Sequence, residues 1–121
     1  RLLTAAIWAP SAHNRQPWRF VVITRPEVKE ALAEAMARPW REDMLRDGIP
    51  PEEMAVRIQR SHDRLTQPPA LILGCLTMAD MDAYPDPKRQ QPERTMAIQS
   101  LTLALGNLML AAHHEGLGSC W

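Results

Sequence analysis

The sequence predicts an α+β fold in which helices pack on a small central sheet. The expected elements are a helix, a strand, two helices, a strand, a loop, a long helix and a last strand, without the regular alternation of βαβ units. Neither a GxGxxG sequence nor a Walker lysine motif occurs, which argues against a dinucleotide-binding or P-loop fold. The 121 residues are 45% hydrophobic and 23% charged, as expected for one globular domain and not for a disordered chain.

The first quarter of the chain predicts a helix, a loop and a strand. Residues 1–9 carry apolar side chains at helical spacing and end before Pro10, which cannot continue a helix. Residues 10–18 contain two prolines and no apolar period, which predicts a loop. Residues 19–24 are rich in β-branched and aromatic side chains, which predicts a strand.

A helical pair is predicted next. Thr24 and Glu27 have the spacing of a capping box, with a proline between them, so a helix is expected to run to about Ala37 and to end at Pro39. The stretch 39–51 is expected to be a surface segment with a short helical piece at most. A second charged helix is expected from Glu52 to about Leu65.

The second half of the chain predicts a buried strand and a long helix. Residues 70–76 form a continuous apolar run, which is typical of a strand buried on both faces, and residues 79–92 predict a long loop. A helix is expected from about Glu93 to Glu115, with apolar side chains on opposite faces, so it needs a partner on each side. We expect one stripe to cover the subunit's own sheet and the other to contact a second subunit. The sequence does not decide which stripe has which partner. One stripe holds Ile98, Leu101, Leu105, Leu108 and Met109; the other holds Met96, Leu103 and Leu110.

The two ends of the sequence indicate a partial chain. The sequence begins inside a helical pattern at Arg1 and ends at Trp121, where a strand is expected to start. We therefore expect residues 1–121 to form a single domain that is truncated at both ends.

The charge balance argues against several classes of protein, and the cysteine spacing indicates a cellular location. Basic and acidic residues both number 14, and this balance argues against a nucleic-acid binder or a polybasic membrane-surface protein. The long helix carries too many polar residues for a lipid-facing span. Cys75 and Cys120 form no CxxC pair, so a cytoplasmic location is expected. The first 26 residues carry four arginines and no acidic residue, which suits a bound phosphate unless these arginines pair with acids elsewhere.

Two segments could carry chemistry. The loop over residues 10–18 offers hydroxyl, imidazole, amide and guanidinium groups that suit a phosphate or a planar heterocycle, although an ordinary polar connector is an alternative. The glycine-rich turn over residues 114–121 contains Gly116, which suits a helix C-cap, and Gly118, which allows close backbone approach.

No residue is predicted to be a catalytic nucleophile, general base or metal ligand. The adjacent His113 and His114 point about 100° apart on a helix, and neither HExxH nor a Cys/His cluster occurs. A Ser-His-Asp or Cys-His assembly stays open as an alternative, but no local motif supports one.

Two motifs resemble the nitroreductase family of FMN flavoproteins. They are APSAHNRQPWRFVVI at 9–23 and GNLMLAAHHEGLGSCW at 106–121, in the family's order, and the resemblance covers essentially the whole chain. Two further stretches, WREDMLRDG at 40–48 and DAYPDPKR at 82–89, are similar to the nitroreductase-like domain associated with coenzyme F420 biosynthesis.

The resemblance implies a nitroreductase-like fold and a homodimer with FMN at each of two sites in the subunit interface. The loop at residues 10–14 would lie against the flavin, commonly from the partner subunit. The backbone of residues 116–119 would approach the opposite side of the ring. The phosphate ligands are expected outside residues 1–121, with Arg15 and Arg19 as weak substitutes. The implied cofactor-binding residues are Pro10, Ser11, Ala12, His13, Asn14, Gly118 and Ser119.

The resemblance also implies an activity. The protein is expected to be an FMN-dependent oxidoreductase that passes hydride from NAD(P)H, as co-substrate, through the flavin to a nitroaromatic, quinone, enone or deazaflavin-like acceptor. A flavin or deazaflavin binding protein without turnover is one alternative. A specialised enzyme that cleaves FMN or acts in F420 maturation is another. Trp40, Arg41 and Asp43 are expected to line the acceptor side of the flavin, with a charged surface turn as the alternative.

Overall fold

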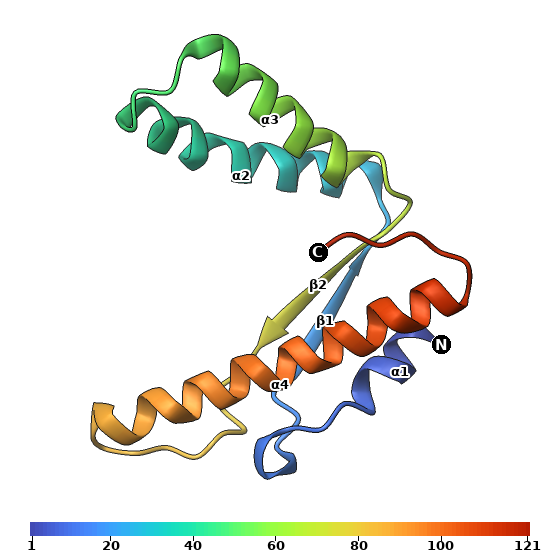
Figure 1. Ribbon diagram of the computed structural model, residues 1–121, viewed down its shortest axis with the longest axis vertical. Coiled ribbons are helices and arrows are strands. Elements are labelled where there is room, and N and C mark those ends of the chain that lie inside the picture. The colour runs from blue at the N-terminus through green and yellow to red at the C-terminus, as the bar shows by residue number, and fades with distance from the viewer. The chain divides into compact units, whose positions relative to one another are not determined.

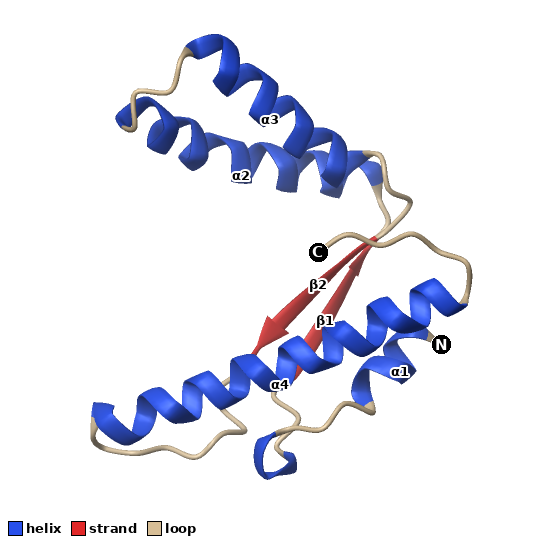
Figure 2. Ribbon diagram, in the orientation of Figure 1, coloured by secondary structure: helices blue, strands red, loops and turns tan.

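The computed structural model describes residues 1–121. Its two strands form one sheet (Figure 1), and their arrows point in opposite directions, so the pair is antiparallel (Figure 2). The α+β class with a small sheet is therefore confirmed. The elements are α1 (Leu2–Ile7), the 3₁₀ turn η1 (Ala12–Asn14), β1 (Trp18–Ile23), α2 (Pro26–Arg46), α3 (Pro51–Thr66), β2 (Leu71–Leu76) and α4 (Pro87–His114).

The chain divides into two compact units. One unit contains residues 1–21 and 74–121, and the other contains residues 22–73. The first unit holds α1, η1 and α4, whereas the second holds α2 and α3. The two segments that could carry chemistry, residues 10–18 and 114–121, therefore lie in the first unit.

Small side chains form the contact between α1 and α4. Ala6 of α1 and Ala97 and Ala104 of α4 are completely buried, and such short side chains allow two helix backbones to approach closely. The amide of Asn107 donates a hydrogen bond to the carbonyl of Ala5 at 3.3 Å. The long helix is thus fixed to the N-terminal helix by shape and by a polar contact.

A neighbouring face of α4 covers β2. A side chain at Gly74 would place its Cβ 3.0 Å from Leu105 Cδ1 and 3.3 Å from Leu101 Cδ1, so glycine permits these leucines to reach the strand. One of the two predicted stripes, to which both leucines belong, therefore covers the sheet. Ile98, which was assigned to the same stripe, is 48% exposed instead.

The helix α4 begins at Pro87, six residues before its predicted start. Asp86 caps it, because its carboxylate accepts hydrogen bonds from the backbone N–H of Arg89 at 3.0 Å and from the Arg89 Nε at 2.5 Å. The predicted loop over residues 79–92 is therefore shorter than expected. The helix is also long and apolar enough to cross a membrane by length and composition, a test that core helices of soluble proteins pass as well.

The helix α2 continues through Pro39 to Arg46, so the predicted end at Pro39 is wrong. The missing N–H of Pro39 costs one backbone hydrogen bond. Contacts with α3 offset this cost on both sides of the proline, since Ala33, Ala37 and Met44 are all buried. The predicted capping box is also absent, because α2 begins after Arg25 without a side-chain cap.

The second predicted helix and both strands are confirmed within one or two residues, as α3, β1 and β2. However, β2 is not buried on both faces. Its residues are half-buried or exposed, and Leu73 is 45% exposed. No further strand follows α4 in residues 115–121.

Buried and paired charges join α2 to α3. The Lys29 ammonium is 5% exposed and donates hydrogen bonds to the carbonyls of Thr66 at 2.8 Å and Pro68 at 2.5 Å. Such a cation satisfies carbonyl groups left free at the end of α3. Nearby, Glu30 lies 2.7 Å from His62 Nε2, and this hydrogen bond raises the pKa of the His62 imidazole above 6.5.

Candidate functional site

The loop between α1 and β1 has an unusual backbone conformation. His13, Asn14 and Gln16 all have left-handed φ angles of 51–52°. Ser11 holds the turn together, since its carbonyl accepts from the Asn14 N–H and its hydroxyl accepts from the Gln16 N–H, both at 3.0 Å. The loop is therefore a defined structure and not a simple connector.

A buried serine attaches this loop to α4. The backbone N–H of Ala12 donates to Ser100 Oγ at 3.1 Å, while the Ser100 hydroxyl donates to the Met96 carbonyl at 2.7 Å. Ser100 is 3% exposed. Its positioning role was not predicted, because Ser100 is one of several polar residues in this helix and only tertiary packing distinguishes it.

The arginines near the N-terminus are paired with acids. Arg15 forms an ion pair with Asp82, and Arg19 Nη2 lies 2.7 Å from Asp80 Oδ2. Both acids follow β2, so these pairs join the residues around β1 to the next loop. The remaining two arginines contact Glu115 and Glu27. All four arginines therefore pair with acids, three of them from distant segments, which was the alternative to a bound phosphate.

The two C-terminal glycines, Gly116 and Gly118, have different structural roles. Gly116 has a φ of +76° and ends α4, where the Leu117 N–H donates to the Ala112 carbonyl at 2.9 Å, so its predicted C-cap role is confirmed. A Cβ at Gly118 would meet no atom within 4 Å. No packing within this chain therefore requires glycine at position 118, and both Gly118 and Ser119 are exposed.

The structure does not bring the two predicted cofactor-binding segments together within one chain. The loop at residues 10–14 contacts α4 near Ser100. The C-terminal tail, residues 115–121, leaves the helix after His114 (Figure 1). The 1.5 Å rise per residue separates these positions by about 20 Å along the helix. The two segments are therefore attached to α4 at well-separated points.

The predicted acceptor-side residues lie on the second unit. Trp40, Arg41 and Asp43 belong to α2, so the expectation of a mostly irregular surface segment is wrong. Arg41 lies 3.5 Å from Glu34, and Asp43 lies 2.8 Å from Arg46. The two charged side chains thus have partners on their own helix.

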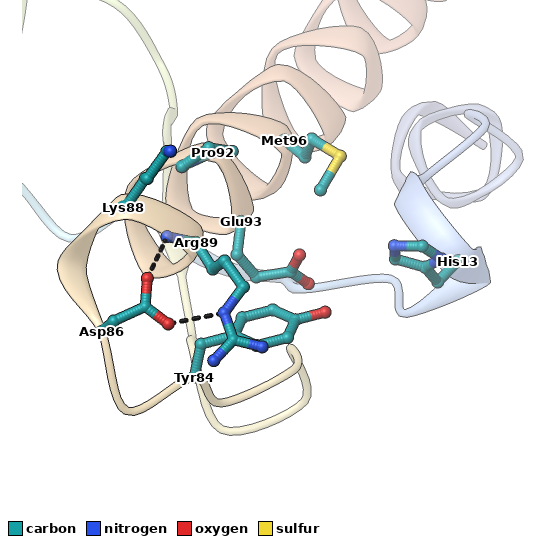
Figure 3. Close-up of a pocket in the computed structure, with 8 residues that line it drawn as sticks. All are labelled: His13, Tyr84, Asp86, Lys88, Arg89, Pro92, Glu93 and Met96. Carbon is teal, nitrogen blue, oxygen red and sulfur yellow. Dashed lines mark hydrogen bonds and ion pairs between the residues drawn. The ribbon is translucent and has the colours of Figure 1, made fainter.

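A pocket of about 520 Å³ opens between η1, the loop after β2 and the start of α4 (Figure 3). The Arg89 guanidinium lies 5.1 Å from the centre of the Tyr84 ring and extends one wall. Beside it, potential ligand atoms of His13, Asp82 and Glu93 all lie within 4.8 Å of one another. The sequence analysis missed this cluster because its members come from three separate segments. The lining residues are His13, Tyr84, Asp86, Lys88, Arg89, Pro92, Glu93 and Met96.

Comparison with known proteins defines the class to which this fold and loop belong. The model of the Nitroreductase family matches residues 1–121, so the chain belongs to the nitroreductase family. A protein of Archaeoglobus fulgidus, provisionally named NADH dehydrogenase/NAD(P)H nitroreductase, is 28% identical over the whole chain, which spans 51% of that relative. An NADH dehydrogenase of Thermus thermophilus is 59% identical over 34 residues, or 28% of this chain and 17% of the relative.

Solved structures support the same fold. A BluB-like flavoprotein from Clostridium difficile 630 superposes with a TM-score of 0.70 at 26% identity, over 99% of this chain and 61% of that one. Oxidized iodotyrosine deiodinase bound to FMN and 3-iodo-L-tyrosine gives a TM-score of 0.57 at 24% identity, over 98% of this chain and 58% of that one. The second comparison supports the fold alone. The predicted nitroreductase-like fold of a partial chain is confirmed.

Proposed function

We propose that this chain is part of an FMN-dependent oxidoreductase that transfers hydride from NAD(P)H to a small organic acceptor. Membership of the nitroreductase family and the likeness to a flavoprotein support this proposal. The observation that carries it is the ordered loop Pro10–Asn14, fixed to α4 through the buried Ser100 and exposing polar groups on its outer side. When bound, the flavin supplies the hydride chemistry, and the protein supplies binding and orientation.

The residues present fit such a cofactor. Asn14 is exposed, and its amide can both donate and accept hydrogen bonds, which suits the alternating carbonyl and N–H edge of a flavin. The open space beside Gly118 allows a planar ring to approach the backbone of the tail. Arg15 and Arg19 are occupied by Asp82 and Asp80, so we propose that the phosphate ligands lie outside residues 1–121.

We further propose that the flavin site is shared between two copies of the chain. The loop and residues 115–121 are attached to α4 at points about 20 Å apart, which favours contacts with two different rings over contacts with one. In a two-fold dimer, the loop of one subunit can face the tail of its partner. Leu103 and Leu110 are 50% and 72% exposed and lie on one face of α4, which offers an apolar surface for such an interface.

Trp40, Arg41 and Asp43 are the proposed acceptor-side residues. Trp40 and Asp43 are exposed and Arg41 is half-buried, so an indole and two surface charges, each charge paired on its own helix, can face an organic acceptor. We place the protein in the cytoplasm, with no nucleic-acid or membrane partner.

Absorption spectroscopy of the purified full-length protein tests the proposed activity. A flavin spectrum that bleaches on anaerobic addition of NADH or NADPH, and recovers with an acceptor, is the expected result. A flavin spectrum that neither nucleotide bleaches would instead indicate a binding protein without turnover. A protein that contains no flavin and cannot be reconstituted with FMN would refute the flavin site.

A further inference from the structure

We propose that His13, Asp82 and Glu93 bind one divalent transition-metal ion at the edge of the pocket. The three side chains come from η1, the loop after β2 and α4, and their potential ligand atoms lie within 4.8 Å of one another. An imidazole with two carboxylates is a donor set that suits ions such as Zn²⁺ and Mn²⁺.

Glu93 gives this cluster a nearly buried carboxylate that no cation of this chain neutralises. Glu93 is 2% exposed, yet no arginine, lysine or histidine forms an ion pair with it. One carboxylate oxygen accepts the Asp82 N–H at 3.2 Å, and no hydrogen bond reaches the other. Because burying an uncompensated carboxylate is costly, such groups are normally paired with a cation or coordinate a metal.

The spacing of the cluster fits an ion better than a direct contact. No hydrogen bond or ion pair joins His13 to either carboxylate. In Figure 3, the Glu93 carboxylate points from α4 into the space in front of the His13 ring. Ligand atoms around a bound ion lie about 3–4 Å apart, given metal–ligand distances near 2.1 Å. The exposed His13 side chain can rotate to close the remaining distance.

An arginine neutralises the Asp82 carboxylate, whereas the Glu93 carboxylate has no neighbouring cation and can bind the ion. Arg15 pairs with Asp82, and Arg89 pairs with Asp86, so neither cation compensates Glu93. The Asp82 carboxylate has a second oxygen, so the Arg15 contact leaves Asp82 a further acceptor site. The adjoining pocket opens to solvent, which leaves room for water or a small ligand on the free coordination positions of the ion.

Metal titration of the full-length protein tests this site. Metal-free protein is titrated with ZnCl₂ by calorimetry and, separately, with MnCl₂ by electron paramagnetic resonance of the free ion. We expect one site per chain for at least one of these ions. We also expect His13→Ala and Glu93→Gln each to weaken binding by at least the roughly tenfold that loss of an outer-shell partner can cause.

His114→Ala is the matched control, because His114 is an exposed histidine at the far end of α4 and should leave the affinity unchanged. Circular dichroism verifies that each variant is folded, and the exposed His13 position gives a test that does not depend on the buried Glu93. Absence of binding to the wild type would refute the site. Wild-type affinity in folded His13→Ala or Glu93→Gln protein would refute the three-residue site as well.

Discussion

The backbone N–H of Ala12 donates a 3.1 Å hydrogen bond to Ser100 Oγ, although 88 positions separate the two residues. This bond joins the loop that carries the proposed flavin contacts to a completely different part of the sequence. Ser100 is buried, and its own hydroxyl donates to the Met96 carbonyl. The orientation of the loop therefore depends on a residue that makes no proposed contact with the cofactor.

Replacing this serine should loosen the loop. We expect Ser100→Ala to destabilise the protein by about 1–3 kcal/mol, because the part-buried N–H of Ala12 loses its acceptor. We also expect faster FMN dissociation, which fluorescence of the released flavin measures. Thr102→Ala is the control, since the Thr102 hydroxyl donates to the Ile98 carbonyl in the same way without contacting the loop. Equal flavin retention in both variants would contradict the positioning role.

Asn14 should contribute both to the loop backbone and to flavin binding. Its φ of 52° is tolerated by asparagine and glycine, but a leucine at this position would strain the backbone. Asn14→Gly therefore removes the amide while keeping the loop conformation. We expect both Asn14→Gly and Asn14→Leu to weaken FMN binding by about 1–3 kcal/mol, with a lower melting temperature for Asn14→Leu. Normal FMN affinity in Asn14→Gly would show that Asn14 only shapes the loop.

His62 of α3, which contacts Glu30 of α2, should make stability depend on pH. The hydrogen bond that the His62 ring donates to Glu30, helped by Asp63, raises the pKa of folded His62 above its ordinary value of 6.5, while burial acts in the opposite direction. Protonation thus favours the folded state. The resulting stabilisation is complete below pH 6.5 and is lost as the pH rises through the folded pKa.

Nuclear magnetic resonance titration of the His62 imidazole measures this pKa directly. We expect Glu30→Gln to move it back toward 6.5 and to reduce the pH dependence of the melting temperature. Glu27→Gln is the control, because Glu27 lies on the same helix and contacts Arg25 instead. A His62 pKa at or below 6.5 in the wild type would contradict the assignment.

Arg41 should affect the reaction of the flavin with the acceptor and not its reduction by NAD(P)H. We expect Arg41→Ala to change the rate of flavin reoxidation by the acceptor while leaving anaerobic reduction by NAD(P)H unchanged. Stopped-flow absorbance measures the two half-reactions separately. Because Arg41 contacts Glu34, a Glu34→Gln control reports the effect of losing that ion pair alone. Equal loss in both half-reactions would indicate that Arg41 is only structural.

Local sequence signals predicted the type of most elements but not their ends. The helix was wrongly predicted to end at Pro39, because burial of Ala37 and Met44 against α3 outweighs one lost hydrogen bond. Conversely, Asp86 and Pro87 form a good helix start that was overlooked within a proline-rich stretch. Packing therefore sets the end of α2, whereas a local capping signal sets the start of α4.

The candidate site was predictable only where one segment supplies it. The loop over residues 10–14 was found from its own residue types, and its structure is consistent with that interpretation. Ser100 and Glu93 could not be added from the sequence, since their proximity to the loop arises from the packing of α4. Tertiary contacts between distant segments leave no local pattern.

The exposed face of α4 provides a test of the shared site. Leu103 is 50% exposed and Leu110 72% exposed, whereas the neighbouring faces of the helix contact α1 and β2. Burying a leucine is worth about 1.5–3 kcal/mol, so an interface that covers this face gains substantially from it. We expect Leu103→Asp to dissociate the full-length dimer and to release FMN, since the loop and tail then no longer meet across the interface.

Sedimentation equilibrium at low micromolar concentration, combined with flavin absorbance, measures both effects on the same sample. Thr102→Asp is the matched control, because this exposed position points about 100° away around the helix and should preserve both dimer and flavin. A folded Leu103→Asp dimer with normal flavin content would place the interface on another face. A stable wild-type monomer loaded with flavin would refute the shared site itself, because one chain would then complete the binding site without a partner.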